Sequence, residues 1–135
     1  MKILGIEHIG IAVDDLNKTY SFWGNILNIL HTHTEVVESE QVKTTIFDTK
    51  KGKIELLSPI SSNSVIEKFI KNKGTGIHHV CLEVDDISKA IIKLEEKNIV
   101  LINNKPKIGA EGYKIIFIHP KSTGGVLVEL AEKPK

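Results

Sequence analysis

His8-Ile-Gly-Ile-Ala-Val-Asp-Asp-Leu-Asn-Lys18 and His79-Val-Cys-Leu-Glu-Val-Asp-Asp-Ile-Ser-Lys89 are two copies of one pattern, 71 positions apart in a chain of 135 residues. The His, one Val, both Asp residues and the Lys occupy matching places. Each copy reads as a strand of alternating character, then an Asp-Asp helix start, then an amphipathic helix. The repeat therefore predicts two modules with the same fold.

Strand patterns continue after each predicted helix. They cover residues 29–37, 42–48 and 53–57 after the first copy, and 100–102, 113–119 and 125–130 after the second. The residues between the two halves predict a polar loop and a short helix at 64–73, ended by Gly74 and Gly76. The prediction is an α+β chain of two tandem βαβββ modules, about 4–58 and 75–131, with a helical linker at 59–74.

Strand alternation places one His and one Glu of each half on the face opposite the apolar face. These residues are His8 and Glu55 in the first half and His79 and Glu129 in the second. If the apolar faces pack under the helices, the four side chains point the other way and can converge. Two imidazoles and two carboxylates suit a divalent ion such as Co, Ni, Zn or Mn, and an open position would let it act as a Lewis acid.

Other polar residues have simpler interpretations. A lone His or Glu in a strand is most often hydrogen-bonded or solvated, and only the symmetry of the four residues favours a metal site. His31 and His33 alternate by two, so we expect them on one strand face, as surface residues. His119, which precedes a proline, either lines a pocket edge or caps a strand end.

Charge and composition exclude several classes of function. The chain has 18 basic and 17 acidic residues and a net charge of +1, so it lacks the basic field that nucleic acid or an anionic membrane requires. No apolar run approaches the length of a membrane span. The single cysteine, Cys81, excludes an internal disulfide and predicts a reducing, cytoplasmic location. All 18 basic residues are Lys, so an acidic ligand must be held by point charges, backbone amides or a metal.

Three segments carry a family resemblance: Gly76-Ile-His-His-Val80, Lys107-Ile-Gly-Ala-Glu-Gly112 and, most specifically, His119-Pro-Lys-Ser-Thr-Gly-Gly-Val-Leu-Val-Glu-Leu130. They resemble the methylmalonyl-CoA epimerases, which belong to the vicinal oxygen chelate superfamily together with glyoxalase I. The resemblance runs from about Ile6 to Leu130. It implies one vicinal oxygen chelate domain over 1–135, whose modules form a curved, mostly antiparallel eight-stranded sheet around a metal-binding cleft.

The resemblance also implies roles for individual residues. The family's metal ligands fall on His8, Glu55, His79 and Glu129, with Co2+ the first expectation and Zn2+, Ni2+ or Mn2+ the alternatives. Glu129 matches one residue proposed as a catalytic base. The other proposed base falls at Thr44, which leaves Glu40 and Gln41 as catalytic candidates nearby. The expected contacts to the cofactor portion of a CoA thioester are His119, Lys121, Ser122 and Thr123.

The implied function is a metal-dependent epimerase that interconverts (2R)- and (2S)-methylmalonyl-CoA by proton exchange at C2, through a metal-stabilised enolate. One alternative is glyoxalase I, acting on the glutathione hemithioacetal of methylglyoxal, which the absence of Arg disfavours. Another is a metal-free protein that binds small molecules, which the aromatic content of 5% disfavours. We expect a small CoA thioester as substrate, no nucleic-acid or membrane partner, and a homodimer.

Overall fold

Each copy of the repeat folds as a strand, a helix and three further strands, in a computed structural model that describes residues 1–135. The strands are β1 (Ile3–Ala12), β2 (Leu30–Val37), β3 (Val42–Asp48), β4 (Lys53–Pro59), β5 (Gly76–Val84), β6 (Lys107–Ile108), β7 (Lys114–Ile118) and β8 (Val128–Glu132). The helices are α1 (Leu16–Tyr20), α2 (Val65–Lys73) and α3 (Ile87–Glu96), with a π-helix η1 (Ser21–Ile26) and the 3-10 turns η2 (Glu38–Glu40), η3 (Ala110–Gly112) and η4 (Pro120–Ser122). The predicted α+β class and βαβββ order are confirmed.

The strands form one mixed eight-stranded sheet in the order β2-β3-β4-β1-β5-β8-β7-β6. The chain divides into two compact units: a first unit, His8–His78, and a second unit, Met1–Glu7 together with His79–Lys135. Strands β1 and β5 each contribute residues to both units. The single domain over 1–135 with modules 4–58 and 75–131 stays a prediction.

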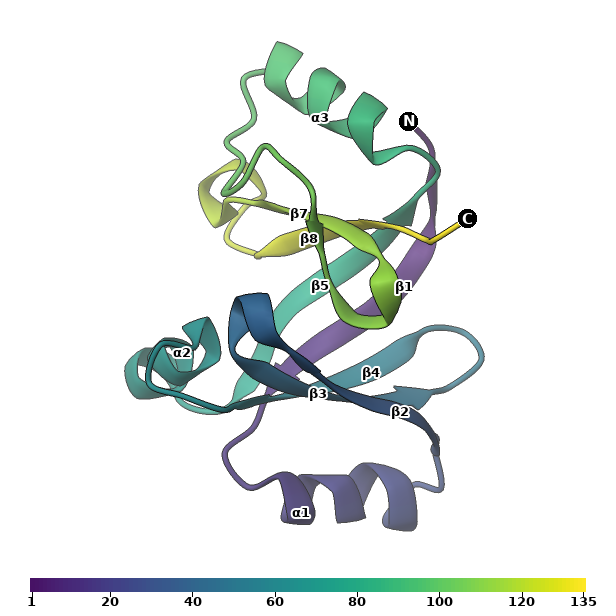
Figure 1. The fold of residues 1–135 in the computed structure, drawn as a ribbon, viewed down its shortest axis with the longest axis vertical. Helices are drawn as coiled ribbons and strands as arrows, with labels where there is room; N and C mark the ends of the chain where they lie inside the picture. Colours follow the sequence, from purple (N-terminus) through teal and green to yellow (C-terminus); the bar gives the residue numbers. More distant parts are fainter. The chain divides into compact units, whose positions relative to one another are not determined.

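In the first unit, β1 runs parallel to β4, and β3 lies antiparallel to both β4 and β2. Figure 1 shows α1 along one face of these strands. Asp15 begins the helix by accepting a hydrogen bond from Lys18 N at 3.0 Å. The helix covers a core of Val13, Phe47 and Leu56. The apolar strand face therefore lies under the helix, as the alternation predicts.

The helix after Asp15 does not stay α-helical over its whole length. From Ser21 to Ile26 it is a π-helix, and Leu27 N donates to Phe22 O, five residues back, at 3.0 Å. Gly24 lies in this wide turn, where a Cβ would be 3.0 Å from a ring carbon of Phe47. A side chain at this position would therefore press against the Phe47 ring, which would have to shift by a few tenths of an ångström.

In the second unit, β5 runs parallel to β8, and β7 lies antiparallel to both β8 and β6. Helix α3 begins at Asp86, whose side chain accepts from Lys89 N at 3.0 Å. Its buried side chains pack on the strands in one cluster: Val84, Ile87, Ala90, Ile91, Ile116, Ile118 and Leu130. This unit repeats the layering of the first, with the apolar strand face under a helix.

The strand predicted at 100–102 is wrong. Only an isolated bridge between Leu101 and Ile118 occurs there, and the strand that pairs with β7 is Lys107–Ile108. The Val100 N–H donates a hydrogen bond to Ser122 Oγ at 3.0 Å. Individual hydrogen bonds, rather than a regular strand ladder, therefore hold this segment against the end of β7. The segment has the apolar composition that is typical of a strand, but it does not pair as a strand does.

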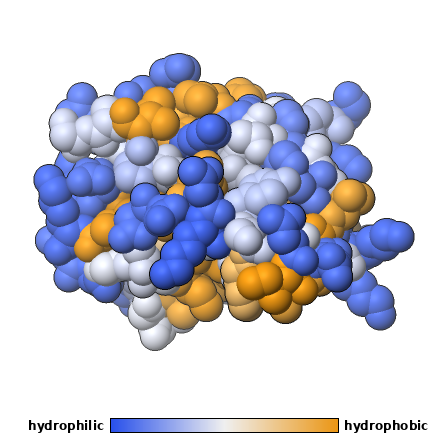
Figure 2. Space-filling model, turned by 90° about the horizontal axis from the view of Figure 1, so that it is seen from below, coloured by the Kyte–Doolittle hydropathy of each residue, from blue (hydrophilic) through white to orange (hydrophobic).

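None of the helices combines the length and the apolar character that crossing a lipid bilayer requires. Some large apolar side chains are exposed, among them Ile26, Leu30 and Ile77. On the face seen in Figure 2, hydrophobic residues form separate groups among hydrophilic ones. Scattered exposure of this kind is ordinary for a protein surface and by itself indicates no partner.

Candidate metal centre

The first unit holds a buried pair formed by His8 of β1 and Glu55 of β4. His8 Nε2 lies 3.4 Å from Glu55 Oε2, and each side chain is 8% exposed. The parallel register sets Gly10 opposite Glu55, and His8, two residues before Gly10, lies on the same face as Gly10. The side chains of His8 and Glu55 therefore share one sheet face. This is the face opposite the core of α1, as predicted.

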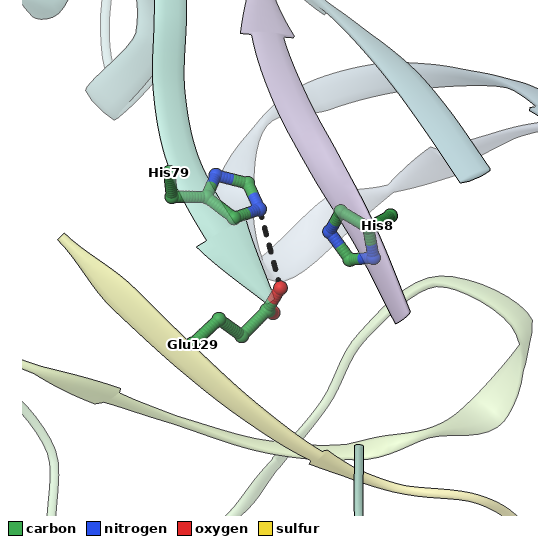
Figure 3. A group of neighbouring side chains, drawn as sticks. All are labelled: His8, His79 and Glu129. Atoms are coloured by element: carbon green, nitrogen blue, oxygen red, sulfur yellow. Dashed lines mark ion pairs between the residues drawn. The ribbon is translucent and has the colours of Figure 1, made fainter. Parts of the chain in front are cut away.

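The second unit holds the equivalent pair, His79 of β5 and Glu129 of β8. His79 Nε2 lies 3.2 Å from Glu129 Oε1, with side chains 5% and 7% exposed (Figure 3). Cys81 is in register with Glu129, so His79 and Glu129 also share one face. The rings of His79 and Phe117 meet in an edge-to-face arrangement, with centroids 5.7 Å apart.

His8, His79 and Glu129 can each offer one ligand atom, and these atoms lie within 4.8 Å of one another. Burying a carboxylate is costly unless its charge is compensated. A divalent cation would supply the missing charge, and nitrogen and oxygen donors suit the borderline metals. The chemistry of the donor set therefore fits a divalent metal ion.

Comparison with known proteins identifies the family. The model of the glyoxalase/bleomycin resistance protein/dioxygenase superfamily matches residues 7–117. The mitochondrial methylmalonyl-CoA epimerase of Mus musculus is 41% identical over 132 residues, which cover 97% of this chain and 74% of the relative. The chain belongs to the methylmalonyl-CoA epimerase family.

Solved structures of the epimerase family have the same fold. The crystal structure of methylmalonyl-CoA epimerase from Mycobacterium tuberculosis matches with a TM-score of 0.94 and 30% identity, over 98% of this chain and 90% of that chain. A methylmalonyl-CoA epimerase in complex with methylmalonyl-CoA and NH4+ matches with a TM-score of 0.92 and 30% identity, over 98% and 96%. The eight-stranded fold expected from the resemblance is confirmed.

The two further catalytic candidates lie at the end of the β2–β3 hairpin, past its last residue pair, Val37 and Val42. Glu40 is the last residue of turn η2, and Gln41 follows it. Gln41 has a left-handed backbone, with φ 51°. Its side-chain amide donates to Glu38 O at 2.9 Å and to Glu38 Oε2 at 3.1 Å. Gln41 therefore stabilises its own turn, and the catalytic role of Glu40 and Gln41 stays a prediction.

The residues expected to contact CoA lie in and around turn η4. His119 Nδ1 accepts from Lys121 N at 3.1 Å, so His119 caps this turn. Ser122 Oγ accepts from Val100 N, and Thr123 Oγ1 accepts from Val126 N at 3.1 Å and donates to Pro120 O at 3.2 Å. These contacts hold the loop closed, and the predicted CoA contacts of His119, Lys121, Ser122 and Thr123 stay a prediction.

The expectation that His31 and His33 share a strand face is wrong, because a β-bulge lies between them. His31 is in register with Phe47 and packs against its ring at 5.7 Å, on the helix-covered face. His33 is in register with Ile46, which is opposite Glu55, so His33 lies on the sheet face of His8 and Glu55.

Sequence reasoning missed Glu35, which follows His33 on the same face. Glu35 is in register with Thr44, where the epimerase family resemblance expects a base, and Thr44 Oγ1 donates to Glu35 O at 3.3 Å. The alternation of His33, Glu35 and Val37 was the available signal. It could not be connected to the ligand face without knowledge of the bulge.

Proposed function

We propose that this protein is a metal-dependent epimerase that interconverts (2R)- and (2S)-methylmalonyl-CoA. The observation that carries the proposal is the pair of buried His–Glu contacts, His8–Glu55 and His79–Glu129, at equivalent positions of the two halves. The grouping of His8, His79 and Glu129 within 4.8 Å supports a shared site. Membership of the epimerase family and the likeness to a structure with bound methylmalonyl-CoA support the substrate.

His8, Glu55, His79 and Glu129 would hold the metal, which the resemblance expects to be Co2+, with Zn2+, Ni2+ or Mn2+ also suited to the donors. A divalent cation held by these residues would supply Lewis-acid stabilisation of the negative charge that develops when C2 loses its proton. The burial of all four side chains excludes water, and electrostatic interactions are stronger where water is excluded. With no Arg in the chain, the substrate's acidic end depends on this centre.

Glu129 would take the proton from C2, because a carboxylate next to the reacting carbon can act as a general base. Lys121 is exposed in turn η4 and would serve the outer phosphates of CoA as a point charge. We also propose that the protein is a homodimer with a cytoplasmic location. Light scattering coupled to size-exclusion chromatography measures the oligomeric state.

The test uses the full chain, stripped of metal and reloaded separately with Co2+, Zn2+, Ni2+ and Mn2+. Each form receives (2R)-methylmalonyl-CoA in D2O. We expect inversion, read by a mutase that accepts one epimer, and deuterium at C2, read by mass spectrometry. Absence of both with all four metals overturns the proposal. Formation of lactoylglutathione above background from methylglyoxal and glutathione would favour the glyoxalase alternative.

A further inference from the structure

The two outer strands of the eight-stranded sheet differ in length and in charge. The outer strand of the second unit, β6, has two residues, one of them Lys107. Short strands and lysines are both ways in which proteins protect a sheet edge from pairing with another chain. The outer strand of the first unit, β2, has eight residues, contains neither Lys nor Pro, and pairs with β3 alone. The outer side of β2 is therefore open to a further strand.

The β-bulge in β2 interrupts only the start of this edge. It lies between His31 and His33, and from His33 to Val37 every residue of β2 is matched in turn to one residue of β3. The side chains of this stretch remain accessible, with Val36 44% exposed. The second part of β2 therefore keeps the regular geometry that a further antiparallel strand requires.

The sequence that leads into β2 has the composition of an interface. Residues 19–34 contain no Asp, Glu, Lys or Arg, the longest run of this kind in a chain in which 26% of the residues are charged. The Tyr20 ring lies 5.3 Å from the His31 ring, so this helical segment packs beside β2. The centres of interfaces are poor in charged residues and rich in aromatic ones. The exposed large apolar side chains of the run are Phe22, Ile26, Leu27 and Leu30.

The side chains of β2 are complementary to those of a second copy of the same strand. When two identical antiparallel strands are related by a two-fold axis, the residues on either side of the axis are matched in reverse order. An axis at Thr34 sets His33 opposite Glu35 of the second copy, and Glu35 opposite its His33. An axis at His33 or at Glu35 would set two imidazoles or two carboxylates opposite each other, and like charges in direct opposition are destabilising. Charge therefore favours Thr34 as the centre.

We propose that β2 pairs antiparallel with β2 of a second copy of this chain, with the two-fold axis at Thr34, and so joins two sheets into one. Within one chain, His33 Nε2 lies 3.0 Å from Glu35 Oε1, and these side chains are 43% and 30% exposed. Both groups are thus accessible to their counterparts across the axis, where opposite charges and paired threonines are favourable. This interface rests on the homodimer of the proposed function and is independent of the epimerase reaction.

Cysteine cross-linking of the full chain tests the register. Directly opposite residues of antiparallel strands have Cα atoms about 4.5 or 5.5 Å apart, within the range that a disulfide spans. Thr34→Cys should therefore form a disulfide-linked dimer under mild oxidation, seen by non-reducing gel electrophoresis. Thr32→Cys is the matched control, because Thr32 is also exposed in β2 and its counterpart would lie four residues away, about 13 Å along the strands. It should cross-link no more than the unmodified chain, whose Cys81 is buried.

Substitutions that change charge test the energetics of the interface. Thr34→Lys sets two lysines opposite each other at the axis and should raise the dissociation constant of the dimer by about tenfold or more in analytical ultracentrifugation. Ile92→Lys, at an exposed position of α3, is the control and should leave this constant unchanged. Glu35→Lys should also weaken the dimer, and adding His33→Glu to it should restore dimerisation, because a carboxylate then faces a lysine across the axis.

Two results overturn the β2 interface while the homodimer stands. One is cross-linking of Thr34→Cys that does not exceed that of Thr32→Cys. The other is a dissociation constant of folded Thr34→Lys, checked by circular dichroism, within about threefold of that of the unmodified chain. If Thr34→Lys does not fold, the comparison of the two cysteine variants decides. An unmodified chain that is monomeric at every concentration overturns both the homodimer and this interface, whereas loss of epimerase activity alone affects neither.

Discussion

The two halves keep the same His–Glu pair but surround it differently. In the first unit, the neighbours of Glu55 across the strands are Gly10 and Ile46, and the next row carries Thr44 and Glu35. In the second unit, the corresponding neighbours of Glu129 are Cys81 and Phe117, and the next row carries Ala131 and Ile115. The repeat is preserved at the buried His–Glu pair and has diverged beside it.

The two halves differ most at the edge strand of each unit. Thr44 of the first unit is opposite Glu35 of the edge strand β2, and the equivalent Ile115 of the second unit is opposite Lys107 of the edge strand β6. Ile115 also belongs to a buried apolar cluster with Cys81, Tyr113 and Ala131. One fold, used twice, thus carries a His–Glu pair at one edge and a lysine at the other.

The largest effect should come from removing what the halves share. His8→Ala and His79→Ala should each lose bound metal and lower epimerisation by more than the 10- to 100-fold typical of losing an outer-shell partner. Elemental analysis and turnover measure both. His78→Asn is a matched control, because His78 packs against Phe69. Loss of metal from only one of the two Ala variants would show that the halves are not equivalent.

Core truncation tests whether the halves are equally important for stability. Leu56→Ala in the first unit and Ile116→Ala in the second remove side chains with no exposed area. Each should lower the free energy of unfolding by about 2–5 kcal/mol in urea titrations. We expect a single transition for both variants, because β1 and β5 pass through both units. Two resolved transitions would contradict this, and Ile92→Ala, at an exposed site, is the control.

A smaller change gives the first half some of the apolar character of the second. Thr45 is buried, and its hydroxyl has no hydrogen-bond partner, while the equivalent residue of the second half is Ile116. Thr45→Val should raise the free energy of unfolding by about 1 kcal/mol, because it removes an unsatisfied polar group. Thr44→Val, which loses the bond to Glu35 O, should lower it by a similar amount. In thermal unfolding experiments we expect the free energy of unfolding to rise for Thr45→Val and to fall for Thr44→Val.

The smallest effect concerns the helix starts. In the second unit, the backbone N–H of Lys2 donates to Asp85 at 2.7 Å and lowers the pKa of this carboxyl below its ordinary value of 3.8. The carboxylate then stabilises the fold above that ordinary value, and the contribution disappears as the pH falls through the lowered pKa. Asp85→Ala should lower the melting temperature slightly at pH 7 and not below the lowered pKa. Asp14→Ala, at the equivalent place in the first half, is the comparison; an equal shift at both pH values would contradict this account.

The two buried His–Glu pairs were predictable because they depend only on period-two alternation and on the repeat, while their role as metal ligands stays a prediction. His8, Glu55, His79 and Glu129 each stand among apolar neighbours, so burial of the apolar face determines where they point. The same logic failed for His31 and His33. Thr32 suits an ordinary strand, and the extra residue in β2 is defined only by its pairing with β3.

Two other differences arise from contacts that composition does not encode. The apolar segment at 100–102 resembles a strand, but Lys107 and Ile108, which are less typical, make the ladder with β7. In the π-helical turn at Ser21–Ile26, Gly24 lies close to the Phe47 ring of strand β3, a contact distant in sequence. Tertiary packing overrides local preference in both places.

The bulge in β2 makes the pairing register, rather than the spacing of residues in the sequence, decide which face His33 and Glu35 occupy. Paired without the bulge, the unchanged sequence would set His33 opposite Thr45 and turn His33 and Glu35 toward the core of α1. Deleting Thr32 would instead leave His33 opposite Ile46, because His33 would then follow His31 directly in a regular ladder. The extra residue therefore lets two histidines at a spacing of two lie on opposite faces of one strand.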